Sequence, residues 1–158
     1  MVPVKRPSKN RIKLNEKIAK LRAKEKRCRE YNAHQISSYV TKNDAFNTIC
    51  LEDLNISGML KNHKTAKSTS NASMYRLKQQ IEYKGGWYGK NVVKIDTMAP
   101  STQICNCCGY RNTDLRGYDG LSIRKWTCPQ CGAKHDRDIN AAKNIKDWGY
   151  KKITEGKQ

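Results

Sequence analysis

The sequence predicts an α/β fold that carries a small inserted metal-binding ribbon. Two short runs of β-branched and apolar residues, 47–53 and 91–96, are typical of buried strands, and a segment with helical spacing lies between them. The order strand, helix, strand favours a parallel pair with a crossover connection. Two C-x-x-C pairs, with 19 residues between them, predict the ribbon.

Length and charge limit the classes of function. The chain has 158 residues, so we expect one principal domain and a small insert. It carries 32 Lys and Arg against 14 Asp and Glu, a net charge of +18. Because this excess repels itself unless an acidic partner shares it, a nucleic-acid backbone is the favoured partner. An anionic membrane surface is the weaker alternative.

We expect a soluble, cytoplasmic protein that does not enter a membrane. No apolar run approaches the roughly 20 residues that span a bilayer, and the opening MVPVKRPSKN lacks the apolar block of a signal peptide. The chain has seven cysteines, and four of them form the C-x-x-C pairs. This odd number and this spacing indicate reduced thiols on a metal rather than disulfides.

A long basic helix is predicted at residues 8–41, with a break near Asn32 as the alternative. Residues 1–42 carry 13 Lys and Arg against three Glu, which favours contact with phosphates over a merely solvated helix face. The apolar residues that recur there at helical intervals are Leu14, Ile18, Leu21, Cys28, Tyr31, Ile36 and Tyr39.

The middle of the chain predicts the strand, helix, strand unit. The first strand ends on Glu52 and Asp53. Residues 55–73 are polar, contain Gly and Ser and show no period, so we expect a mobile surface loop there. A helix that starts near Met74 runs toward the two glycines of YKGGWYGK, where we expect it to loosen.

The paired cysteines predict a zinc site. Two residues between thiols let one tight turn aim both sulfurs at a single ion, and the glycine that follows each pair tolerates a left-handed bend. Four thiolates make a closed tetrahedral shell, so we expect structural Zn²⁺ and no catalysis by this metal. The predicted ligands are Cys105, Cys108, Cys128 and Cys131.

Two further candidate ligands lie near this set. Cys107 or His135 could replace a ligand, but four well-spaced sulfurs already complete the shell, so we expect both to be spectators. A structural zinc contributes on the order of 10 kcal/mol to its own fold, and the short polar arms of the ribbon need it. The basic residues of the ribbon are candidates for nucleic-acid contact: Arg111, Arg116, Arg124 and Lys125.

Acidic residues stand at the start of the last predicted helix and at the end of the first strand. Asp136 and Asp138 precede INAAKNIKDWGY, whose apolar residues fall on one helical face. An aspartate at a helix start is often a plain N-cap, and a glutamate at a strand end, such as Glu52, is often only solvated. From the residues alone, capping and a functional role both stay open.

The chain closely resembles the C-terminal part of the transposon-encoded TnpB (OrfB-type) family in four motifs that occur in the family's order: ICLEDLNISGML, RLKQQIEYKGGWYGKNVVKID, PSTQICNCCGY and WTCPQCGAKHDRDINAAKNI. Members of that family are compact RNA-guided DNA nucleases related to type V CRISPR effectors. The basic helix before the first motif also looks like that of the family. The resemblance therefore covers essentially the whole chain.

The resemblance implies a RuvC-like nuclease half, an RNase H-type fold with a zinc ribbon inserted before the last helix. Glu52 matches the family's second catalytic acid and Asp138 its third; with a first aspartate, such acids hold two Mg²⁺ ions at a scissile phosphate. The four paired cysteines match the zinc ligands. DNA and a guide-type RNA are the implied partners. The implied segments are a basic helix (1–45), a strand-helix-strand part (46–100), the ribbon (101–135) and a C-terminal helix (136–158).

The family's first motif, a strand with a glycine and an aspartate, has no counterpart before LEDL. We therefore expect a truncated RuvC-like fold without its first strands, an incomplete two-metal site and no appreciable cutting by this chain alone. A two-strand remnant has an open apolar edge, which an upstream polypeptide that supplies the missing strands could cover. The alternatives are a non-catalytic zinc-ribbon module that binds nucleic acid and, more weakly, a ribbon that docks on an acidic protein face.

Overall fold

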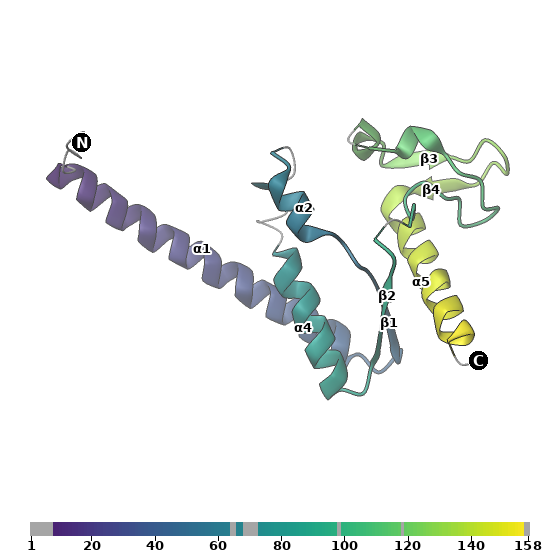
Figure 1. Cartoon of the computed structure of the whole chain (residues 1–158), viewed down its shortest axis with the longest axis horizontal. Helices are drawn as coiled ribbons and strands as arrows, with labels where there is room; N and C mark the ends of the chain where they lie inside the picture. The colour runs from purple at the N-terminus through teal and green to yellow at the C-terminus, as the bar shows by residue number, and fades with distance from the viewer. Residues whose placement is uncertain (1–7, 64–65, 68–72, 98, 118, 157–158) are drawn as a thin grey trace, which may run out of the picture. The chain divides into compact units, whose positions relative to one another are not determined.

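The computed structural model describes residues 8–63, 66–67, 73–97, 99–117 and 119–156 (Figure 1). The chain divides into two compact units: a helical unit, Met1–Asn43 with Ile56–Lys84, and a sheet unit, Asp44–Asn55 with Gly85–Gln158. The main elements in chain order are α1 (Lys9–Lys42), β1 (Thr48–Glu52), α2 (Ile56–Lys61), α4 (Met74–Trp87), β2 (Asn91–Ile95), β3 (Lys125–Thr127), β4 (Lys134–Asp136) and α5 (Arg137–Glu155).

The helix α1 is unbroken over its 34 residues. It contains neither proline nor glycine, and its many Lys, Arg and Glu residues favour the helical state. The side chain of Ser8 caps its start by accepting a hydrogen bond from the backbone nitrogen of Arg11. The break near Asn32 is therefore absent, and the prediction of one long helix is confirmed.

In the helical unit, a buried lysine joins the C-terminal part of α1 to α4. The amino group of Lys84 donates to Ser37 Oγ at 2.7 Å, to Ser38 Oγ at 2.8 Å and to the carbonyl of His34 at 3.0 Å. Burial, and then the charge of Lys42, lowers the pKa of Lys84. The small side chains of α1 on this side allow the close approach of the two helices.

Two expectations about the middle of the chain are wrong. Part of the predicted loop forms the short helix α2, in which Ile56 is buried; the rest lies partly outside the described residues. The helix α4 continues through Gly85 and Gly86 instead of loosening there. A Cβ atom on Gly85 would collide with the side chain of Val92, so this glycine permits close packing of the helix end against β2.

The sheet unit contains the predicted parallel pair. β1 and β2 pair in register from Thr48 opposite Asn91 to Glu52 opposite Ile95, and within the described residues this sheet has no third strand. The predicted strands and their parallel pairing are confirmed. Ile49, Val93 and Ile95 supply buried apolar side chains from the two strands.

The helix α5 packs on one face of this sheet. A Cβ atom on Gly149 would lie 3.0 Å from Cys50 Cβ and 3.6 Å from Ile95 Cδ1, so glycine lets the helix approach both strands. Nearby, Lys152 Nζ donates to the carbonyl of Lys94 at 2.9 Å. None of the helices in the described ranges combines the length and the apolar character that crossing a bilayer requires.

The segment between β2 and α5 forms a small hairpin ribbon. β3 and β4 pair antiparallel, and an isolated bridge joins Ile104 to Arg111. Its buried cluster consists of Cys105, Leu115, Trp126 and Cys128, with Ile123 packed against it. Two of these four residues are cysteines, so the apolar core of the ribbon is small. We therefore expect a ligand bound to the sulfurs to contribute to the stability of the ribbon.

Candidate metal centre and acidic site

The four predicted cysteine ligands lie together in the ribbon. The sulfur atoms of Cys105, Cys108, Cys128 and Cys131 are all within 4.8 Å of one another. Cys105 Sγ is 3.7 Å from Cys131 Sγ, and Cys108 Sγ is 3.6 Å from Cys128 Sγ. Thiolates bound to zinc at tetrahedral corners are about 3.8 Å apart, because each Zn–S bond is about 2.3 Å. The four sulfurs therefore fit a zinc ion.

Each cysteine pair sits on a turn that a glycine closes. Gly109 donates from its backbone nitrogen to the carbonyl of Cys105 at 2.8 Å, and Gly132 does the same to Cys128 at 2.9 Å. Both glycines have positive φ, 78° and 70°, a conformation that strains other residues. The predicted role of the glycine after each pair is confirmed.

Two of the thiols have strongly shifted pKa values. Burial raises the pKa of Cys128, but hydrogen bonds from the backbone nitrogens of Cys131 and Gln130 and from neighbouring thiols outweigh it and lower the pKa to about 7. A backbone hydrogen bond at Tyr110 lowers the pKa of Cys108, but burial and the neighbouring thiols outweigh it and raise the pKa to about 12. Without a metal, the cluster thus favours a thiolate at Cys128 first, and metal binding must displace the remaining protons.

His135 and Cys107 lie beside the same cluster. His135 Nε2 is 3.1 Å from Cys105 Sγ. The imidazole packs against the Trp126 ring at a centroid distance of 4.7 Å. Cys107 Sγ, Cys105 Sγ and a ring nitrogen of His135 lie within 4.8 Å of one another. Both residues that we expected to be spectators therefore border the predicted metal site.

Two asparagines of α5 hold the first cysteine turn, a role that the sequence patterns did not predict. Asn140 is 1% exposed; its amide donates to the carbonyl of Ile104 at 2.6 Å and its oxygen accepts from the backbone nitrogen of Asn106 at 3.0 Å. Asn144 is 4% exposed and donates to the carbonyls of Ile104 and Ser101. The spacing of four residues on one helix face was the available signal.

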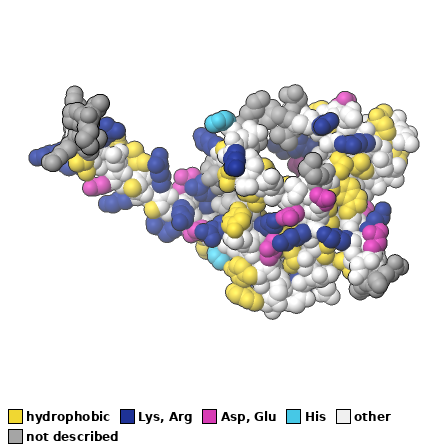
Figure 2. Space-filling view, in the orientation of Figure 1, with side chains coloured by type: hydrophobic (Ala, Val, Ile, Leu, Met, Phe, Trp, Pro, Cys, Tyr) yellow, Lys and Arg dark blue, Asp and Glu magenta, His cyan; other side chains and the backbone are white. Residues whose placement is uncertain are grey.

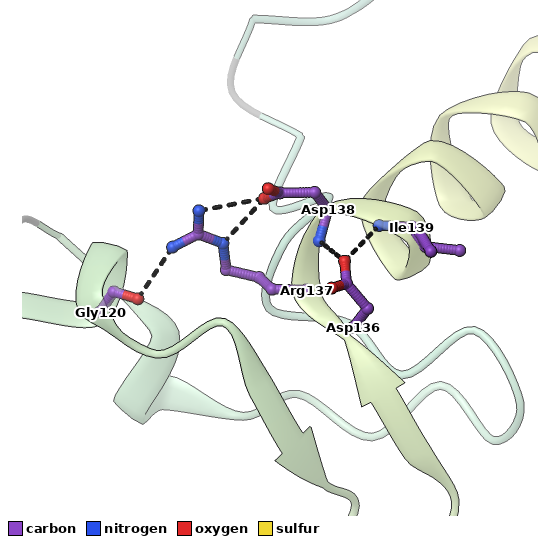
Figure 3. Close-up of polar contacts among 5 residues, drawn as sticks. All are labelled: Gly120, Asp136, Arg137, Asp138 and Ile139. Carbon is purple, nitrogen blue, oxygen red and sulfur yellow. Dashed lines mark hydrogen bonds and ion pairs between the residues drawn. The ribbon is translucent and has the colours of Figure 1, made fainter.

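At the start of α5, the two aspartates have different roles. Asp136 is the N-cap, because its Oδ1 accepts from the backbone nitrogens of Asp138 and Ile139, both at 3.1 Å. Asp138 lies in the first turn, and its Oδ1 accepts two hydrogen bonds from Arg137 at 3.1 and 3.0 Å. Figure 3 shows the guanidinium of Arg137 between Asp138 and the carbonyl of Gly120. Both hydrogen bonds from Arg137 to Asp138 end on Oδ1, and Oδ2 takes no part in them.

Glu52 ends β1 on the face of the sheet that α5 covers. Successive side chains of a strand point to opposite faces, so Glu52 shares a face with Cys50, which packs against Gly149. Glu52 is half-buried, and this burial raises the pKa of its carboxyl group. A half-buried carboxylate on this face is a candidate ligand for a cation.

The helix α5 runs antiparallel to both strands. The backbone of Lys94 contacts Lys152, whereas Ser101 and Ile104, farther along the chain, contact Asn144 and Asn140. The first turn of α5 therefore lies toward the edge at which β1 and β2 end (Figure 1). Glu52 ends β1 at this edge, and Asp138 lies in the first turn of α5. Their convergence on one cation stays a prediction.

Comparison with known proteins agrees with these features. Residues 75–145 match the family described as Cas12f1-like, TNB domain. The chain resembles a Cas12f1 chain in a cryo-EM structure of a Cas12f1-sgRNA-target DNA complex, with a TM-score of 0.64 and 21% identity over 86% of this chain and 38% of that one. At this identity the structural match shows a shared fold.

Curated relatives extend the match over most of the chain. A Streptomyces pristinaespiralis protein provisionally named an RNA-guided DNA endonuclease is 40% identical over 140 residues, which are 87% of this chain and 33% of that protein. The TnpB-like protein L79 of Acanthamoeba polyphaga mimivirus is 33% identical over 114 residues, 68% of this chain and 21% of that protein. The chain thus spans at most about a third of the length of these relatives. It belongs to the TnpB family.

Proposed function

We propose that this chain is a nucleic-acid-binding part of an RNA-guided DNA endonuclease of the TnpB type, and that it carries two acids of the nuclease site and a structural Zn²⁺. The carrying observation is the antiparallel run of α5 along the sheet, which brings its first turn to the edge where β1 ends. Glu52 and Asp138 are the two acids. The last strand of the hairpin ribbon, β4, leads directly into α5 and so positions the start of that helix.

The proposed zinc is held by the four paired cysteines, whose spacing fits a tetrahedral shell. A closed shell of four sulfurs leaves no open position, so its role is structural. A bound zinc would make the cysteine turns rigid. Asn140 and Asn144 connect α5 to the first of these turns, because they bind its backbone. The metal therefore fixes the helix that carries Asp138.

The proposed Mg²⁺ site uses carboxylate oxygens, which are the ligands that this ion prefers. Bound Mg²⁺ would activate water and stabilise the leaving oxygen at a phosphodiester. Glu52 favours its protonated form more than an exposed carboxyl does, so the positive charge of a cation would draw the proton off. Arg137 holds one oxygen of Asp138 and so orients its carboxylate.

The proposed fold is RuvC-like, of the RNase H type, without its first strands. The described sheet has two strands, and a nuclease of this kind needs a further carboxylate from another strand. An upstream polypeptide that pairs with the sheet would supply this strand and its carboxylate. This incompleteness is why we expect no appreciable cutting by the chain alone. Its proposed location is the cytoplasm.

DNA and a guide-type RNA are the proposed partners. The net charge of +18 favours acidic partners, and the cryo-EM relative is described as a complex with sgRNA and target DNA. Figure 2 shows Lys and Arg side chains spread along α1, with hydrophobic side chains between them. The alternative function is a non-catalytic zinc-ribbon module that binds nucleic acid, which the two-stranded sheet favours.

A complementation assay separates these two functions. The chain is mixed with the part of the Streptomyces relative that it does not match, a guide RNA, target DNA and Mg²⁺. We expect cleavage only with both polypeptides, and a loss of at least about a hundredfold with Glu52→Gln or Asp138→Asn, since each removes a ligand of the metal that activates the nucleophile. Asp136→Asn is the matched control because asparagine also caps helices. Nucleic-acid binding without cleavage in any mixture would favour the non-catalytic module.

A further inference from the structure

We propose that the ribbon binds a second thiophilic metal ion through Cys105, Cys107 and His135, with the Cys105 thiolate shared between this ion and the ion in the four-cysteine site. Two sulfurs and one ring nitrogen lie within 4.8 Å of one another in this set, the same limit within which the four cysteines gather. His135 Nε2 is 3.1 Å from Cys105 Sγ. A thiolate that binds one ion keeps further lone pairs and can bridge to another.

The imidazole is held in place for this role. His135 lies in β4 directly opposite Trp126 of β3, and the two rings pack at 4.7 Å. This packing limits rotation of the imidazole and keeps one ring nitrogen near Cys105. A ligand that is fixed before binding loses little conformational entropy when the ion arrives.

The second site is open to solvent at one end. Cys105 is 1% exposed, whereas Cys107 is exposed, and His135 is between the two. The second site therefore has a buried end at the shared sulfur and an open end at Cys107. Three protein ligands leave a coordination position for water or an exchangeable group, in contrast to the closed shell of four cysteines.

The ligand chemistry selects the class of metal. Two thiolates and one imidazole suit soft or borderline ions such as Zn²⁺, Cd²⁺ and Cu⁺, and they do not suit Mg²⁺ or Ca²⁺. The competing explanation is that His135 only donates a hydrogen bond to the Cys105 thiolate, as outer ligands of metal sites commonly do. In that case the ribbon binds one ion and Cys107 has no part in it.

The number of bound ions distinguishes the two explanations. The reduced, metal-free chain of 158 residues is titrated with Cd²⁺, while thiolate-to-cadmium charge-transfer absorbance reports Cd–S bonds and native mass spectrometry counts the ions. We expect two ions on the wild-type chain and one on Cys107→Ser, with the affinity for the first ion unchanged. Cys28→Ser removes an exposed thiol outside the ribbon, and we expect this matched control to keep both ions.

Further outcomes decide the proposal. We expect His135→Gln to weaken the second ion at least about tenfold, as loss of a metal ligand does, and to leave the first ion in place. One ion on the wild-type chain, or two on Cys107→Ser, would overturn the proposal. So would loss of both ions from Cys107→Ser, because Cys107 would then belong to the first shell. If His135→Gln fails to fold, the comparison of Cys107→Ser with Cys28→Ser still decides.

Discussion

The side-chain oxygen of Asn140 accepts a hydrogen bond from the backbone nitrogen of Asn106 at 3.0 Å, so a residue of α5 fixes the turn that carries Cys105 and Cys108. The side chain of Asn106 completes the connection by donating to Asn144 at 3.2 Å and to Asp147 at 2.8 Å. Polar contacts thus join the ribbon to the helix.

Replacing Asn140 by alanine should destabilise the chain. The change leaves the carbonyl of Ile104 with one partner fewer and the amide of Asn106 without this acceptor, and each lost buried partner costs about 1–3 kcal/mol. We expect urea denaturation of the zinc-loaded chain to show a total loss of about 2–4 kcal/mol. Lys143→Ala, an exposed change on the same helix, should stay within about 0.5 kcal/mol of wild type. Equal stability of the two variants would refute the role assigned to Asn140.

Gly149→Ala should also destabilise, for a steric reason. The added methyl group meets the Cys50 side chain, and overpacking of this kind typically costs about 1–3 kcal/mol. Adding Cys50→Ala should recover part of the loss, because the obstructing sulfur is gone. Gly86→Ala is the matched control: nothing lies within 4 Å of its Cβ position, and alanine in a helix should stabilise by up to about 1 kcal/mol. Thermal unfolding of the four chains measures these effects.

Zinc affinity should fall steeply with acidity. The pKa of Cys128 is lowered to about 7, and that of Cys108 is raised to about 12, so below neutral pH these two thiols must each lose a proton to bind the metal. We expect the apparent affinity to drop more than about tenfold for each pH unit between pH 7 and pH 5. Competition with a chromogenic chelator measures it. An affinity that is constant over this range would mean that fewer thiolates bind the metal.

Glu52→Gln should stabilise the metal-free chain at neutral pH. Burial raises the pKa of Glu52 above its ordinary value of 4.5, so the folded chain binds this proton more tightly than the unfolded chain does. Stability therefore falls as pH rises through 4.5, and the unfavourable contribution persists at pH 7. Thermal unfolding should show a higher Tm for the variant at pH 7 and a smaller difference at pH 4. A variant that is less stable than wild type at pH 7 would contradict this.

Short-range patterns predicted much of this fold. β-branched runs, C-x-x-C spacing and the order of elements sufficed for both strands, their parallel pairing and the gathering of the four cysteines. The resemblance to the TnpB family came from the same motifs. Capping by Asp136 was one of two roles that the residues alone left open, and the structure shows this aspartate as the N-cap of α5.

Features that depend on tertiary contacts were not predicted. The helix α2 forms in a segment without helical periodicity, where burial of Ile56 accompanies it. The contacts of Asn140 and Asn144 require knowledge of which backbone atoms lie opposite α5. The proximity of His135 to Cys105 depends on the register of β3 against β4, which the sequence does not specify.

The central claim is that Glu52 and Asp138 contribute to one divalent-cation site. Electron paramagnetic resonance of Mn²⁺, titrated into the chain, tests it most directly. We expect Glu52→Gln and Asp138→Asn each to weaken Mn²⁺ binding at least about tenfold and the double variant to weaken it little further, because residues of one site are not additive. Asp136→Asn should bind as wild type does. Single variants that bind Mn²⁺ as tightly as wild type would contradict the claim.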